Sequence, residues 1–165
     1  MEPFILSNGH AALALYVILE KYEGKDAEAL YLKHGTHPNR DLDDGIWCTT
    51  GSLGHGVTVA VGMAIANRER NVYVLMSDGE CAEGSVWESL AIAEKLQLDN
   101  LRITVVANGQ GAYGKLDVDT LDKRLMEFYP TLCLRVNVFQ LPSWMQGIPG
   151  HYVTMDKKMY EEILK

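Results

Sequence analysis

The chain has 165 residues, 47% of them hydrophobic, and a formal net charge of −7. This length and apolar content suit one globular domain with a sizeable core. The acidic balance disfavours nucleic acid or an anionic membrane as the main partner, because both call for clustered Lys and Arg.

The cysteines and the lengths of the apolar runs indicate in which cellular compartment the protein is expected. Cys48, Cys81 and Cys133 form no Cys-x-x-Cys pair, and an odd count argues against a closed disulfide framework. No apolar run reaches about 18 residues, and the N-terminus lacks the basic and apolar regions of a signal peptide. We therefore expect a cytoplasmic protein in a reducing environment, with neither a membrane span nor a signal peptide.

The chain opens with a strongly apolar stretch that predicts a helix. Ser7 or Asn8 is its expected N-cap, and the helix should run to Tyr22 with Gly24 as its stop. Because its residues are apolar on nearly every side, we expect this helix to be buried.

A second helix and a long loop are expected next. The helix covers 27–33, and residues 34–51 carry Gly, Pro, Asn and Asp at turn-forming density. Long loops in compact domains are usually functional or disordered, and Trp47 favours order, so we interpret this one as a site loop. The helix predicted for 54–68 has small residues on several faces, which suits packing against a sheet or a partner chain.

The centre of the chain predicts a β-loop-α-β unit. The runs 71–76 and 101–107 read as buried strands, and 85–96 has apolar residues at helical spacing. Such a unit has parallel strands joined by a right-handed crossover. If the strands are neighbours, Asp78 and Asn108 leave the same sheet edge side by side.

A carboxylate and an amide oxygen placed together can share one hard cation. Gly79 would let the backbone approach a bulky anion, and Gly84 precedes a helix whose N-terminus attracts phosphate. Open α/β sheets bind ligands at this edge, which suggests Mg²⁺ held between Asp78, Asn108 and a diphosphate. The plainer alternative is an ordinary strand-end turn with solvated polar residues.

The last third of the chain completes the predicted elements. A helix is expected over 119–129, a third strand over 132–139, a turn-rich segment over 142–150 and a terminal helix over 155–164. No repeat, low-complexity run or linker interrupts the sequence, so residues 1–165 are interpreted as one domain.

Several ordered motifs resemble the N-terminal, diphosphate-binding half of transketolases. Asp78-Gly79 followed by Asn108 resembles the thiamine-diphosphate motif, although Ser77 replaces its first glycine. Other matching segments are Leu6-Ser-Asn-Gly-His-Ala11, Thr49-Thr-Gly-Ser-Leu-Gly-His-Gly56, Gly62-Met-Ala64 and Glu83-Gly-Ser-Val-Trp-Glu88. The resemblance implies an α/β fold of the thiamine-diphosphate-binding type. That fold is a three-layer, open, mostly parallel sheet with helices on both faces, here as a single trimmed domain.

The resemblance also implies a cofactor site for thiamine diphosphate and Mg²⁺. Asp78, Asn108 and a backbone carbonyl at Gln110 would be the metal ligands. The residues that would contact the cofactor are His10, Gly51, Ser52, Leu53, His55, Asp78, Gly79, Glu80 and Asn108. His10 could instead be a structural histidine, and Leu53 a simple core residue.

Three further residues would serve catalysis by the same resemblance. His37 and His151 resemble histidines that line the substrate channel, and Glu83 resembles an acidic residue at the family's subunit interface. Exposed loop histidines would look the same, as would a carboxylate favoured by a helix N-terminus.

One rival motif is present. Gly109 to Lys115 spells Gly-x-x-x-x-Gly-Lys after a strand, but Leu116 stands where a P-loop needs Ser or Thr to reach Mg²⁺. The next helix is expected only after Asp117, so phosphate would not meet a helix N-terminus directly.

The implied activity is transfer of two-carbon ketol units between sugar phosphates. In this family a second domain presents a glutamate to the cofactor's pyrimidine, and nothing here resembles that domain. The helical lead-in with its Gly-His-Pro motif is also not found, and the stretch between Phe128 and Leu141 looks abbreviated. We therefore expect a separate partner chain, the pyrimidine-binding C-terminal transketolase subunit, in a homo- or hetero-oligomer. The alternatives are another thiamine-diphosphate enzyme, such as a deoxyxylulose-phosphate-synthase-like or decarboxylase system, and a catalytically silent homologue.

Overall fold

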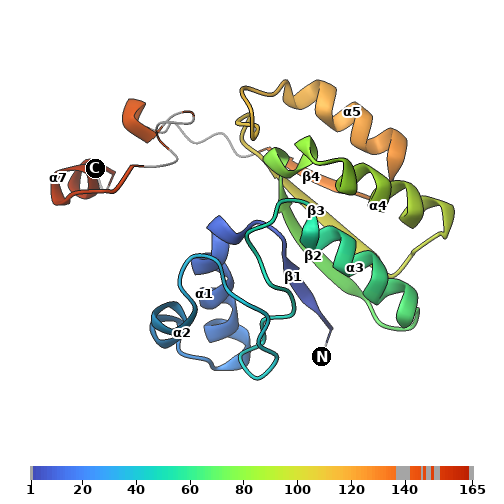
Figure 1. Cartoon of the computed structure of the whole chain (residues 1–165), viewed down its shortest axis with the longest axis horizontal. Coiled ribbons are helices and arrows are strands. Elements are labelled where there is room, and N and C mark those ends of the chain that lie inside the picture. The colour runs from blue at the N-terminus through green and yellow to red at the C-terminus, as the bar shows by residue number, and fades with distance from the viewer. Residues whose placement is uncertain (1, 137–141, 146, 148–149, 151–152, 164–165) are drawn as a thin grey trace.

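The computed structural model describes residues 2–136, 142–145, 147, 150 and 153–163 (Figure 1). Its centre is a four-stranded parallel sheet in the order β1-β2-β3-β4. The strands are β1 (Phe4–Leu6), β2 (Val72–Ser77), β3 (Leu101–Ala107) and β4 (Cys133–Val136). Because all strands run the same way, their carboxyl ends meet at one edge of the sheet.

The helices lie close to the ranges predicted from the sequence. The α-helices are α1 (Ala12–Glu23), α2 (Ala27–His34), α3 (His55–Ala66), α4 (Gly84–Lys95), α5 (Val118–Phe128) and α7 (Lys157–Ile163). Short 3₁₀ turns are η1 (Gly9–Ala11), η2 (Asp78–Ala82) and η3 (Ser143–Met145). Gly24 ends α1 in a left-handed conformation, as its predicted stop requires.

Helices cover both faces of the sheet, as expected for the three-layer fold. Ile5, Val74 and Ile103 point to one face and belong to a core shared with α3, α4 and α5. Leu6 and its neighbour Leu75 point to the other face, where α1 and α2 pack. Figure 1 shows these two groups of helices on opposite sides of the strands.

The parallel central unit is confirmed, with Val74 opposite Ile103 in the register of β2 and β3. In the N-terminal region one strand was missed and one expectation is wrong. Residues 4–6 form an edge strand that was not predicted, and α1 is buried on one side only, because Leu13, Val17 and Tyr22 are 58%, 50% and 74% exposed.

The C-terminal elements are described only in part. The third predicted strand corresponds to β4, described over Cys133–Val136, and residues 137–139 of that prediction lie outside the described residues. In Figure 1, α7 lies apart from the sheet and its helices. None of the described helices is both long and apolar enough to cross a membrane.

Candidate cofactor site

The site lies where β2 and β3 end side by side. Ser77 pairs with Val106, so the residues that follow each strand leave the sheet together. Asp78 is buried, and its Oδ2 accepts hydrogen bonds from the backbone N–H of Asn108 at 2.9 Å and of Gly109 at 2.8 Å. Its Oδ1 accepts the N–H of Gly79 at 3.0 Å. The motif residues 30 positions apart are therefore directly bonded.

The donor set at this edge fits a hard cation. A carboxylate has about four acceptor positions, of which Asp78 uses three on backbone N–H groups. The Asn108 amide oxygen accepts one bond, from the N–H of Gln110 at 2.8 Å, and keeps its second lone pair. The Gln110 carbonyl oxygen lies close to Gly79, since a Cβ built there would be 3.6 Å from it. Asp78, Asn108 and Gln110 thus offer three oxygens of the kind that Mg²⁺ prefers.

Serine is compatible with the first position of the motif. Ser77 has φ −99° and ψ 160°, an extended conformation that any residue adopts. The turn that follows β2 therefore does not need the glycine that the family motif carries there.

Glu80, one of the predicted cofactor contacts, is bonded within the protein interior. Its side chain is completely buried, and its oxygens accept hydrogen bonds from Ser7, Gly54 and Ser77. Next to it, burial and the negative charges of Asp78 and Glu80 raise the pKa of the Cys81 thiol to about 12. Neither side chain is placed to take part in chemistry at the surface of the site.

Residues 51–54, which we call the cofactor loop, lead directly into α3. Gly51 and Ser52 are exposed, Leu53 is half-buried, and Gly54 caps the helix with φ +76°. His55, the first residue of α3, is exposed and borders a cavity of about 410 Å³ together with Arg40 and Trp47. The remaining lining residues are Cys48, Thr49, Val59 and Met63.

His10 and His37 lie together although they are far apart in the sequence. Their rings meet edge to face, with centroids 4.7 Å apart. The approach depends on Gly9, because a Cβ there would overlap the His37 ring and lie 2.8 Å from Thr50 Oγ1. The segment after β1 and the long loop are thus held against each other.

Two further predicted catalytic residues are Glu83 and His151. Glu83 is half-buried and stands at the N-cap of α4, directly after η2. His151 lies outside the described residues. Both assignments stay predictions.

The rival P-loop geometry is not formed. Gln110 and Lys115 pair in an antiparallel bridge, with the Gly111 N–H donating to the Gly114 carbonyl at 2.7 Å. The segment turns back on itself, and α5 begins only at Val118, with Asp117 as its N-cap. In a P-loop the helix starts directly after the glycines and its N-terminus holds the phosphate, whereas in the described segment α5 starts too late for that.

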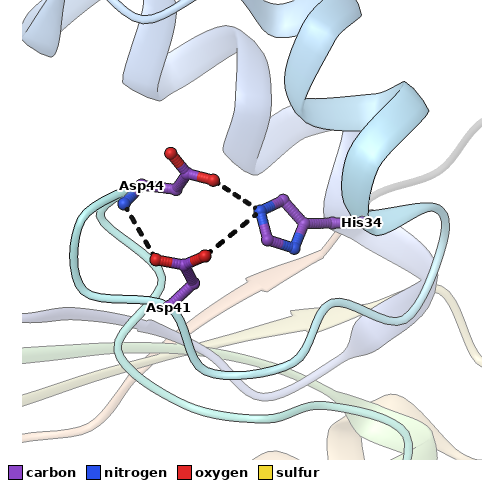
Figure 2. A group of neighbouring side chains, drawn as sticks. All are labelled: His34, Asp41 and Asp44. Carbon is purple, nitrogen blue, oxygen red and sulfur yellow. Dashed lines mark hydrogen bonds and ion pairs between the residues drawn. The ribbon is translucent and has the colours of Figure 1, made fainter.

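A second polar cluster lies on the long loop (Figure 2). His34, at the end of α2, contacts Asp44 at 2.7 Å between Nε2 and Oδ2, and Asp41 lies beside them. Their ligating atoms are within 4.8 Å of one another, as metal ligands can be. The Lys33 ammonium already lies 2.9 Å from Asp41 and 2.6 Å from Asp44. Its bonds hold the pKa of both carboxyls below the usual range, while they raise the pKa of Lys33. We interpret this cluster as an ion-pair network that anchors the loop to α2.

The sequence did not reveal two residues that shape the site. Ser7 and Gly54 both bond Glu80, over separations of 73 and 26 positions. A local signal existed only for Ser77 and Glu80, which stand at the N-cap and N3 positions of a capping box.

Comparison with known proteins agrees with this geometry. Residues 2–130 match the family described as transketolase, thiamine diphosphate binding domain. The chain is 37% identical over 139 residues to one subunit of the apulose-4-phosphate transketolase of Actinobacillus succinogenes, covering 76% of this chain and 50% of that protein. It is 40% identical over 177 residues to transketolase of Homo sapiens, covering 99% of this chain and 25% of that protein.

A solved structure shows the same fold. An Arg-to-Leu variant of transketolase from Pichia stipitis superposes with a TM-score of 0.66 at 30% identity, over 77% of this chain and 22% of that one. The chain thus spans half or less of the length of these relatives. With a family match over most of its length and the motif residues bonded at one sheet edge, the chain belongs to the transketolase family, in its thiamine-diphosphate-binding domain.

Proposed function

We propose that this chain, as one domain, is the diphosphate- and Mg²⁺-binding subunit of a transketolase-like transferase. The enzyme would move two-carbon ketol units between sugar phosphates, with thiamine diphosphate as the source of the carbon nucleophile. The observation that carries the proposal is the bonding of Asp78 to the backbone of Asn108 and Gly109. This bonding supports the proposal because the oxygens that would bind the metal then lie at the sheet edge where α/β proteins bind ligands.

The proposed roles follow from position. Asp78, Asn108 and the Gln110 carbonyl would hold Mg²⁺, which neutralises part of the diphosphate charge. The paired rings of His10 and His37 stand on segments adjoining the cofactor loop and would orient the cofactor and the sugar phosphate.

A separate partner chain is part of the proposal. The Actinobacillus succinogenes and Phocaeicola vulgatus relatives are each named as one subunit of a transketolase, which supports a split enzyme with a pyrimidine-binding subunit. The exposed apolar side chains of α1 would suit an oligomeric contact. The three cysteines are free thiols, in keeping with a reducing cytosol.

The test is a titration of thiamine diphosphate with and without Mg²⁺, on the chain alone and with its partner. Asp78→Asn should abolish the Mg²⁺-dependent part of binding, because the cation loses its charged ligand. Asn108→Ala, a change in an exposed side chain, should weaken it without the structural cost of altering a buried residue.

The matched control is Asp99→Asn, which removes the same charge from an exposed position before β3, at the opposite sheet edge. Its affinity should equal that of the wild type. Equal affinities of wild type, Asp78→Asn and Asn108→Ala would remove the metal assignment. Turnover of ketose phosphate by the purified chain alone would remove the split-enzyme proposal.

A further inference from the structure

We propose that Glu80 is a positioning residue of the cofactor site. Its buried carboxylate would join three segments at the sheet edge and, through them, set the affinity for thiamine diphosphate and Mg²⁺. The inference rests on the proposed function, because it concerns how that same site is held ready for its cofactor.

Three donors from three segments converge on this carboxylate. Ser7 Oγ donates to Oε1 at 2.5 Å, and the Gly54 N–H donates to the same oxygen at 3.1 Å. The Ser77 N–H donates to Oε2 at 2.9 Å. Every partner is a donor, which suits an ionised carboxylate, and bonds of this kind are short and strong.

The charge is balanced by dipoles rather than by a cation. Within the described part of the chain, Glu80 forms no ion pair with Lys, Arg or His. Gly54 is the N-cap of the 12-residue helix α3, so the carboxylate lies at the positive end of its macrodipole. A glutamine could not replace this arrangement, because its NH₂ group would face a donor.

Each bonded segment carries a residue proposed to meet the cofactor. Ser7 precedes His10 at the end of β1, Gly54 lies between Leu53 and His55, and Ser77 directly precedes Asp78. With no exposed surface of its own, Glu80 acts through these neighbours.

The surrounding packing leaves no slack. A Cβ on Gly56 would lie 2.7 Å from Ser7 Cα, and one on Gly54 would lie 2.5 Å from Ser85 Oγ. The start of α3 is therefore wedged between the end of β1 and the start of α4. If the carboxylate bonds were lost, the cofactor loop would shift as a unit. Close packing of the start of α3 against Ser7 and Ser85 leaves no room for one residue to adjust alone.

The test compares two buried serines. Ser7→Ala removes one donor to Glu80, whereas Ser89→Ala removes a buried hydroxyl of α4 that bonds Thr58 Oγ1 at 3.0 Å. Glu80→Gln is the third variant. Thiamine diphosphate, and in parallel inorganic pyrophosphate, are titrated at saturating Mg²⁺ and at a temperature where every variant is folded.

We expect Glu80→Gln to weaken binding of both probes by about 10- to 100-fold, as is typical when a group that orients ligating residues is changed. Ser7→Ala should weaken it less, and Ser89→Ala should bind as the wild type does. If Glu80→Gln does not fold, the comparison of the two serine variants carries the test.

The outcomes separate the two proposals. A wild-type protein that binds neither probe, alone or with its partner, overturns the proposed function. A wild type that binds, with unchanged affinity in Glu80→Gln and Ser7→Ala, overturns only the positioning role. An equal loss in Ser7→Ala and Ser89→Ala overturns it as well, because general loosening would then explain the effect.

Discussion

Two carboxylate clusters hold loops of this protein in place by different means. Glu80 is fully buried and is bound by a hydroxyl and two backbone N–H groups. Asp41 and Asp44 keep 27% and 20% of their side chains exposed and are bound by Lys33 and His34. The first cluster fixes the cofactor loop, and the second ties the long loop that carries His37 to α2.

Because one cluster is buried and the other is partly exposed, the two loops should respond to different changes. Bonds to fixed backbone donors in a dry environment respond to shape and are little affected by salt. Ion pairs near the surface respond to salt and to pH, and they contribute little stability. We therefore expect the cofactor loop to be sensitive to packing changes and the long loop to solution conditions.

The largest expected contrast is in thiol reactivity. Burial, followed by the negative charges of Asp78 and Glu80, raises the pKa of Cys81 to about 12. Against an ordinary thiol with a pKa of about 8.5, Cys81 should hold about a thousand-fold less thiolate at neutral pH. Labelling of the metal-free protein with iodoacetamide, followed site by site by mass spectrometry, measures this. The half-buried Cys133 is the internal reference, and labelling of Cys81 at the same rate would contradict the prediction.

Glu80→Ala should cost the most stability. It leaves the Ser7 hydroxyl and the N–H groups of Gly54 and Ser77 without their acceptor. An unpaired buried donor costs about 1–3 kcal/mol, so the free energy of unfolding should fall by at least about 3 kcal/mol. Urea unfolding of this variant and of Asp44→Ala gives the comparison. A larger loss for Asp44→Ala would reverse our ranking of the two clusters.

Two glycines of α3 test the packing beside Glu80. Gly56→Ala should destabilise the protein by about 1–3 kcal/mol, because the new Cβ would overlap the backbone of Ser7. Gly62→Ala is the matched control in the same helix. No atom beyond the neighbouring backbone of its own helix lies within 4 Å of its Cβ position, so the change should stabilise the protein by about 0.5–1 kcal/mol. Thermal unfolding of both variants would show opposite shifts, and shifts of the same sign would count against the wedge at Ser7.

The smallest effect is expected for Lys33→Ala. The pKa of Asp41 and of Asp44 is lowered in the folded state, so their contribution is present above about pH 3.9 and is lost in stronger acid. The pKa of Lys33 is raised, so its contribution is present below about pH 10.4 and is lost in stronger base. The stability difference between wild type and variant should be greatest between these limits and shrink progressively outside them, and it should be smaller in a buffer of about 1 M NaCl. A difference that is independent of pH and salt would rule out the ion-pair explanation.

The sequence predicted the central unit because its signals are local. The runs that became β2 and β3 are rich in β-branched residues, and the helix between them has clear periodicity. Placing Asp78 near Asn108 needed only the rule that parallel strands end at one edge. β1 was missed because three residues carry too little pattern to be distinguished from a helix start.

Contacts between distant segments could not be predicted. The link from Ser7 to Glu80 and the pairing of His10 with His37 depend on how separate elements pack. The burial of α1 was overestimated because apolar residues on every side do not show which sides the fold covers. The composition of a helix shows how much apolar surface it has, whereas the elements packed against it decide which part of that surface is buried.

The Glu80 bonds also bear on the order in which the chain assembles. One of them joins residues 73 positions apart and another joins residues 26 apart, so two long segments must be closed before the carboxylate has all its donors. Contacts of such sequence separation form late in folding. We therefore expect a refolding chain to regain helical structure before it can bind cofactor, and the amide protons of Gly54 and Ser77 to exchange with solvent only when β1, α3 and β2 come apart together.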